Sequence, residues 1–149
     1  MRDAIGQVFT LQIILAFVLL INGYMAYSVN YTRAFRVKNQ IVNILEQYEG
    51  PYNDEGIDKI NQYIDRMAYD VNNQQMLDFE SKNEGAECPG YKGWCYLTHD
   101  VNINDADGER KGTYYTVVTF VNIDIPVINN IIGLGNFLQV VGETRTIYE

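Results

Sequence analysis

Cys88 and Cys95 are the residues with the clearest chemistry in this chain. They enclose the segment CPGYKGWC, whose proline and glycines favour a turn. No further cysteine or nearby histidine completes a four-ligand metal site, so the pair predicts a disulfide. Such a bond forms in an oxidising environment, which favours a location outside the cytoplasm.

The other residues that catalysis or metal binding would use do not form a recognisable site. His99 is the only histidine, and it lies in a predicted strand without a clear partner acid or nucleophile. The acidic loop 104–109 fails the calcium-loop template, because with Gly108 as its glycine the first ligand falls on Ile103. The GLG at 133–135 lacks the third glycine of a nucleotide loop. We therefore expect no enzyme, no metal and no cofactor.

One long helix organises the rest of the chain. Residues 4–32 carry no charge, and the apolar run over residues 8–27 has the length needed to cross about 30 Å of hydrocarbon. The helical pattern continues as an amphipathic segment and stops only at Gly50 and Pro51. We therefore expect one helix over residues 3–49, roughly 70 Å long, with about half of it outside any bilayer.

Polar residues interrupt the apolar half of this helix. A polar side chain in lipid costs free energy unless it has a partner, so these residues predict packing against other helices. Alternatively, those near the N-terminus lie at the membrane interface and need no partner. Glycines weaken a helix, so any hinge is expected at Asn22 and Gly23. The polar residues are Gln7, Thr10, Gln12 and Asn22.

The charges that flank the apolar run and the cysteines predict opposite orientations. Arg33, Arg36 and Lys38 follow the run, whereas Arg2 and Asp3 precede it. The positive-inside rule alone therefore places the C-terminal domain in the cytoplasm, while the predicted disulfide places it outside. We favour the orientation that the cysteines predict, with the C-terminal domain outside. We expect a basic leader, removed on maturation, that holds the N-terminus inside.

The remainder of the chain predicts a small α+β domain. A second helix over 54–72 carries an apolar stripe that should pack on the long helix, and residues 73–90 are expected to be a polar loop. Strands are expected at 93–103 and 113–125, the second one central, and at 137–148. The loop between the first two strands is expected to be the polar stretch NDADGERKG, and an apolar connector precedes the last strand. The fold class is therefore α+β, with an antiparallel meander of about three strands.

The chain as a whole is acidic. Its 149 residues include 19 acidic and 11 basic residues, which gives a formal net charge of −8. Binding to nucleic acid depends on basic residues that neutralise phosphates. We therefore expect no nucleic-acid partner.

This layout resembles the type IV pilin superfamily. The specific part of the resemblance is the helix over 1–49, apolar first and amphipathic second, followed by a small head with a β-meander and a disulfide over 50–149. Residues 125–149 are also similar in layout to the ends of tight-adherence (TadE-like) pilus subunits, where a proline-containing apolar connector precedes a final strand. Pilins usually carry Glu at the fifth mature position, whereas this chain has Ile5 at position 5 and Asp3 as the nearest acid. Either Asp3 takes the place of that Glu, or Met1 is not the mature N-terminus.

The resemblance implies a structural subunit of an extracellular pilus. Subunits would be held in the inner or cytoplasmic membrane with the head outside, and the pilus assembly machinery would extract them into a helical homopolymer with the helices at its core. The residues of the helix core would be Gly6, Gln7, Thr10, Gln12, Ile13, Phe17 and Leu20. Charge pairing between subunits would involve Asp3, Arg33, Arg36 and Lys38.

Two alternatives stay open. The chain is a minor pseudopilin that initiates or tips a filament made mainly of another subunit, or it is a single-pass, membrane-anchored extracellular binding protein that stays monomeric. The residue at the fifth position favours the monomeric anchor, and the polar residues within the span oppose it. A soluble enzyme is contradicted by the long uncharged run.

Overall fold

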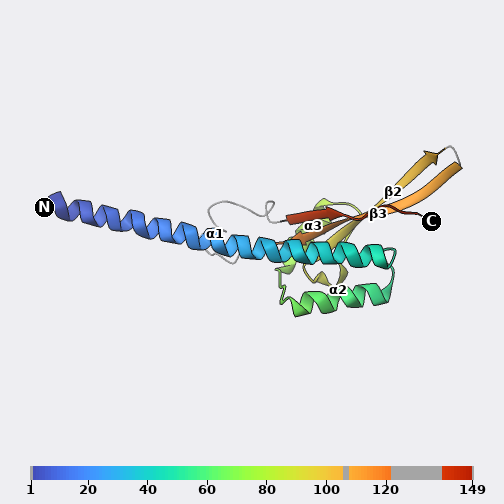
Figure 1. The fold of residues 1–149 in the computed structure, drawn as a ribbon, viewed down its shortest axis with the longest axis horizontal. Helices are drawn as coiled ribbons and strands as arrows, with labels where there is room; N and C mark the ends of the chain where they lie inside the picture. Colours follow the sequence, from blue (N-terminus) through green and yellow to red (C-terminus); the bar gives the residue numbers. More distant parts are fainter. Residues whose placement is uncertain (1, 106–107, 122–138, 149) are drawn as a thin grey trace.

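The computed structural model describes residues 2–105, 108–121 and 139–148. Within these ranges the chain has an α+β fold, as the sequence predicts: a long N-terminal helix, two shorter helices and an antiparallel sheet (Figure 1). The N-terminal half of the long helix extends away from the sheet and the other helices, and its C-terminal half lies against them.

Helix α1 (Arg2–Gln47) is a single helix of 46 residues, which confirms the predicted long helix. It contains no proline and runs unbroken through Asn22 and Gly23. It ends where the sequence predicts, because the backbone N–H of Gly50 donates to the carbonyl of Leu45 at 2.9 Å and Gly50 has a φ of 124°. The hinge at Asn22 and Gly23 stays a prediction.

Helix α2 (Asp54–Arg66) begins where the sequence predicts but ends earlier than residue 72. The side chain of Asn53 caps its first turn by accepting from the Glu55 N–H at 2.9 Å. Ala68 then takes a left-handed φ of 47°, which reverses the chain and leaves Ala68 exposed rather than in the apolar stripe. The predicted end was therefore wrong.

Helix α3 (Asn73–Lys82) occupies part of the segment that the sequence predicts to be a loop. Asn72 caps it by accepting from the Gln74 N–H at 3.0 Å, and Met76 and Phe79 form its buried side. The short strand β1 (Ala86–Glu87) and the 3-10 turn η1 (Pro89–Tyr91) follow it. The prediction of a loop over residues 73–90 was therefore wrong.

Strands β2 (Trp94–Asp105) and β3 (Gly108–Phe120) form a long antiparallel hairpin. Their register runs from Trp94 opposite Thr119 to Asp105 opposite Gly108, so the connecting loop is much shorter than the predicted NDADGERKG. In Figure 1 the paired strands project beyond the C-terminal end of α1. Backbone pairing thus continues into a polar segment that lacks the apolar alternation of a buried strand.

Two further strands pair with β3, which makes β3 the central strand, as predicted. Strand β4 (Gln139–Glu143) pairs with its C-terminal part and β5 (Ile147–Tyr148) with Gly112 and Thr113. The predicted last strand is thus interrupted at Thr144, whose side-chain oxygen accepts from the Tyr115 N–H at 2.9 Å. The apolar connector, and the predicted strand residues 122–125 and 137–138, lie outside the described residues.

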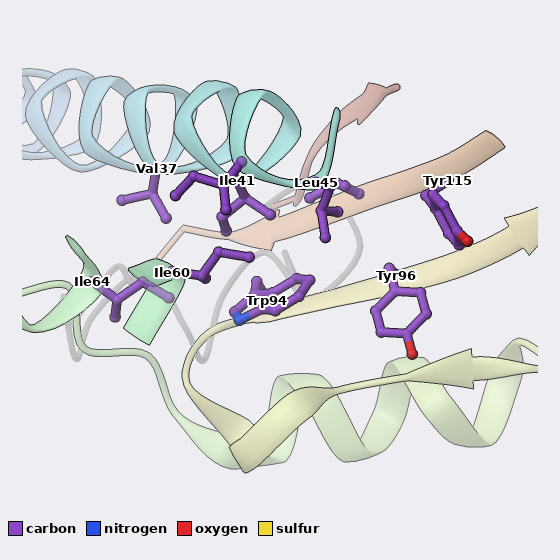
Figure 2. Close-up of a cluster of buried hydrophobic side chains, with 10 residues drawn as sticks. Val37, Ile41, Leu45, Ile60, Ile64, Trp94, Tyr96 and Tyr115 are labelled. Carbon is purple, nitrogen blue, oxygen red and sulfur yellow. The ribbon is translucent and has the colours of Figure 1, made fainter. Parts of the chain in front are cut away.

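The core lies on both faces of the sheet. Tyr115 and Val117 of β3 face α1 and α2, whereas Val118 and Phe120 face α3 and the disulfide, because side chains alternate along a strand. Figure 2 shows the first of these clusters, in which the amphipathic half of α1 packs on α2 and the sheet as predicted. Its buried members are Val37, Ile41, Ile44, Leu45, Ile60, Ile64, Trp94, Tyr96, Tyr115 and Val117.

Candidate membrane and assembly surface

The N-terminal half of α1 leaves its apolar side chains exposed. From Gly6 onward the helix is long and apolar enough to cross a membrane, and none of its most apolar stretch is buried within the chain. Leu19, for example, keeps 72% of its surface exposed. Soluble monomers rarely expose so large an apolar area, which marks a surface for lipid or for other protein chains.

Two of the polar residues in this half are satisfied by the helix itself. The Thr10 hydroxyl donates to the Gly6 carbonyl at 2.9 Å, and the Asn22 side-chain amide donates to the Val18 carbonyl, also at 2.9 Å. Back-bonding of this kind lets a polar group lie in an apolar environment without another partner. Gln7 and Gln12 differ, because their side chains make no hydrogen bond to any described residue.

Five of the residues assigned to a helix core share one side of α1. They follow one another in steps of four and three residues, which is the spacing of a continuous stripe along a helix. A Cβ placed on Gly6 would meet nothing within 4 Å, so another backbone has room to approach there. Gln7 and Gln12 lie roughly 100° and 120° from the middle of the stripe, on its two sides, at 100° per residue. The residues of the stripe are Gly6, Thr10, Ile13, Phe17 and Leu20.

Three tyrosines mark the end of the apolar half. Tyr24 and Tyr31 are exposed, and the rings of Tyr27 and Tyr31 lie 5.9 Å apart. Tyr27 is half-buried, because it also packs against the head at Val121 and Val140. The sequence reasoning did not single out these tyrosines as a group, although their spacing of three and four residues was the signal.

The three basic residues that follow do not have the same surroundings. Arg33 and Arg36 are exposed and make no hydrogen bond or ion pair to any described residue. Lys38 is half-buried: its Nζ lies 4.5 Å from the centre of the Phe35 ring, and its stem covers Gly142 of β4. The side chain of Asp3 is not among the side chains that the structure describes.

We use the name collar for the aromatic and basic residues at the junction of the apolar half and the head. All of its members except Tyr27 are exposed, in contrast to Lys38, which is half-buried on the chain's own sheet. The collar consists of Tyr24, Tyr27, Tyr31, Arg33 and Arg36.

The head contains the predicted disulfide between Cys88 and Cys95. Both cysteines are buried, in a cluster with Met76, Phe79 and Phe120. The bond ties the turn that follows β1 to the start of β2, so it braces the face of the sheet that α3 covers.

The polar residues of the head act as structural partners. His99 stacks on Tyr114 at 4.7 Å, and its Nε2 lies 3.0 Å from the Thr116 hydroxyl. Glu80 and Glu87 help to line a cavity of about 410 Å³ beside the disulfide. Glu80 accepts a hydrogen bond from the Tyr91 hydroxyl, and Glu87 accepts one from the Tyr96 hydroxyl. Among the described side chains, no three His, Cys, Asp or Glu residues gather as a metal site.

Comparison of the chain with protein-family models, with curated proteins and with solved structures gives no match. The geometry itself defines a disulfide-bonded α+β head at the end of a helix that is suited to anchor in a membrane. Within α1 it brings the stripe together on one side, separates Gln7 and Gln12 from it, and places Lys38 on the chain's own sheet.

Proposed function

We propose that this chain is a structural subunit of an extracellular, pilus-like filament that polymerises through α1. Before assembly, α1 holds the subunit in a membrane with the disulfide-bonded head outside. The observation that carries the proposal is the continuity of α1: its apolar, exposed half leads without a linker into the half that forms the core of the head. A pull on the head therefore moves the apolar half with it.

The energetics of assembly favour the stripe as the contact between subunits. Transfer of α1 from lipid to a bundle of helices exchanges one apolar environment for another, so close packing must supply the stability. Gly6 permits a close approach of backbones, and Ile13 and Phe17 offer exposed side chains to interdigitate. Gln12 adds a reason to leave the lipid, because its amide has no partner among the described residues and costs free energy in hydrocarbon.

The resemblance to type IV pilins supports the same proposal. It consists in a long N-terminal helix that precedes a small head containing a disulfide. A disulfide forms outside the reducing cytoplasm, which favours an extracytoplasmic head. The pilus assembly machinery would then supply the energy for extraction from the membrane.

A monomeric membrane-anchored binding protein is the second candidate. Thr10 and Asn22 favour it, because their hydrogen bonds within α1 let them lie in lipid without another helix. A minor pseudopilin is the third candidate and differs from the first only in abundance.

Electron microscopy of material sheared from the cell surface tests the proposal, with the protein identified by its mass. Thin filaments composed mainly of this chain are the expected result. Filaments made mainly of another subunit, with only traces of this chain, would identify a minor pseudopilin. Retention of the chain in the membrane fraction, with no filament containing it, would overturn the proposal in favour of the anchored monomer.

A further inference from the structure

The charges of this chain are segregated along its length. Up to residue 45 the sequence has four basic residues and one acid, a net charge of +3. The rest has seven basic and eighteen acidic residues, a net charge of −11. No acidic residue lies between Asp3 and Glu46, so Arg33 and Arg36 have no neutralising neighbour on their own helix.

When α1 spans a bilayer, the tyrosines of the collar lie near the edge of the hydrocarbon and the arginines lie just beyond the lipid headgroups. If the hydrocarbon covers the apolar run over residues 8–27, Arg33 lies roughly 9 Å beyond its edge, at ~1.5 Å per residue. Side chains of a helix lean toward its N-terminus, so Arg33 and Arg36 reach back toward the membrane. Tyr24 and Tyr27 lie nearer the hydrocarbon, where tyrosine rings are enriched.

We propose that Arg33 and Arg36 bind the phosphates of anionic phospholipids in the leaflet beneath the head, and thereby set the depth at which α1 is held. The guanidinium group donates two parallel hydrogen bonds to a phosphate, and both side chains are exposed without a partner among the described residues. The acidic remainder is repelled by the same surface, so the attraction is confined to the collar. The inference rests on the membrane-held stage of the proposed function and not on the filament.

Anionic lipid fits the collar better than the acidic head of a second copy. The arginines directly follow the exposed apolar run and the tyrosines, so any bilayer that takes up the run brings its headgroups to them. Lys38, the next basic residue, is instead half-buried on Phe35 and Gly142. Among the basic residues that follow the apolar run on α1, the two arginines nearest to it are therefore the exposed ones, and neither pairs with a residue in the part of the chain that the structure describes.

The test is the preference of the full-length chain for anionic lipid around α1. The protein is reconstituted in phosphatidylcholine bilayers that contain a trace of spin-labelled phosphatidylglycerol or spin-labelled phosphatidylcholine. The motionally restricted fraction of each label gives the ratio of their association constants. We expect wild type to prefer phosphatidylglycerol by up to about fivefold per arginine, and to lose most of this preference in 1 M salt.

The double variant Arg33→Gln/Arg36→Gln should lose the preference and keep the emission of the buried Trp94, because both arginines are exposed. Arg66→Gln is the matched control: it removes an exposed arginine from α2 in the head and should keep the preference.

The remaining outcomes distinguish a failure of the lipid-binding proposal from a failure of the proposed membrane anchor. A wild-type chain that enters the bilayer without a preference, or a double variant that keeps it, would overturn the lipid assignment and leave the anchor intact. A double variant that keeps the preference but no longer joins filaments would assign the arginines to a neighbouring acidic head instead. A chain that fails to enter bilayers would overturn the membrane-held stage itself.

Discussion

The Thr119 hydroxyl donates a hydrogen bond to the backbone carbonyl of Ala34 at 3.0 Å, which joins the central strand to α1 across 85 positions of sequence. Thr119 is fully buried, and its hydroxyl also lies 3.3 Å from the Val140 carbonyl on β4. One side chain therefore connects α1, β3 and β4 at the base of the head. Because of this connection, α1 is part of the folded unit rather than a tether.

Thr119→Val should destabilise the head by about 1 kcal/mol. Valine keeps the shape of the side chain but removes the buried hydroxyl and its hydrogen bond to the Ala34 carbonyl. Denaturant unfolding of the full chain in non-ionic detergent measures the effect, with the emission of Trp94 as the signal, since this single tryptophan is fully buried in the head. Thr98→Val, at an exposed position of β2, is the control and should change the midpoint little. Equal midpoints for Thr119→Val and wild type would contradict the role given to this hydrogen bond.

Ile41→Ala should destabilise the head far more than the same change in the apolar half of α1. Ile41 has no exposed surface and lies among Trp94 and the side chains of α2, so truncation leaves a cavity and should cost about 2–5 kcal/mol. Ile14→Ala is the matched control, because Ile14 keeps 54% of its surface exposed in the isolated subunit. The same unfolding assay compares the two variants. Similar losses of unfolding free energy would contradict the prediction that only the C-terminal half of α1 contributes to the core of the head.

Reduction of the disulfide should destabilise the head without changing α1. Closure of a loop of about eight residues removes enough chain entropy from the unfolded state to contribute roughly 2–3 kcal/mol. Unfolding of wild type with and without a thiol reductant measures this contribution. The variant Cys88→Ala/Cys95→Ala should already be destabilised and should not respond to the reductant. A wild-type midpoint that does not move on complete reduction would sink the prediction.

The stability of the head should fall as the pH rises above 10. Burial raises the pKa of Tyr69 well above its ordinary value of about 10, although the Phe120 N–H donates to its hydroxyl oxygen at 2.9 Å. Burial also raises the pKa of Tyr96, and Glu87 adds to the effect. The unfolded chain loses these protons near pH 10 while the folded chain keeps them. The stabilisation is therefore complete below pH 10 and is lost as the pH rises toward the folded pKa.

Unfolding midpoints from pH 8 to pH 11 measure this dependence. Tyr69 alone should contribute a slope of up to about 1.4 kcal/mol per pH unit above pH 10. Tyr69→Phe should be less stable than wild type at pH 8, because the hydrogen bonds to Phe120 and Gly93 are lost, and should have a shallower slope above pH 10. Ile41→Ala is the comparison, since it destabilises the head without removing a hydrogen bond of Tyr69 and should keep the wild-type slope.

Much of the fold could be predicted because its signals are local. The long helix, the disulfide and the central strand each depend on composition, spacing or chain-ending residues within one segment. Helix α3 could not be predicted from periodicity, because Met76 and Phe79 are its only buried side chains. They are buried by the disulfide and Phe120, which lie elsewhere in the sequence. The end of α2 depends on the left-handed conformation of Ala68, for which no glycine gives a signal.

The candidate surface was predicted in outline but not in detail. Its apolar run is visible in the sequence, whereas the hydrogen bonds of Thr10 and Asn22 within the helix appear only when rotamers are known. Lys38 belongs to the predicted basic group, but it covers Gly142 of β4, which lies far away in the sequence. Periodicity along one helix cannot show which of its faces a distant strand will cover.

Ile13→Asp should abolish filaments and leave the head folded. Ile13 lies in the middle of the exposed stripe, so an aspartate there places a charge between helices that must pack without water. The charge also makes membrane insertion less favourable. Leu15→Asp controls for that effect, because Leu15 is equally exposed and lies on the opposite side of the helix, about 160° from Ile13. We expect equal membrane insertion of the two variants, unchanged Trp94 emission in both, and filaments in the sheared fraction only from Leu15→Asp. Abundant filaments from Ile13→Asp would contradict assembly through this stripe, since an unpaired charge buried between packed helices is strongly destabilising.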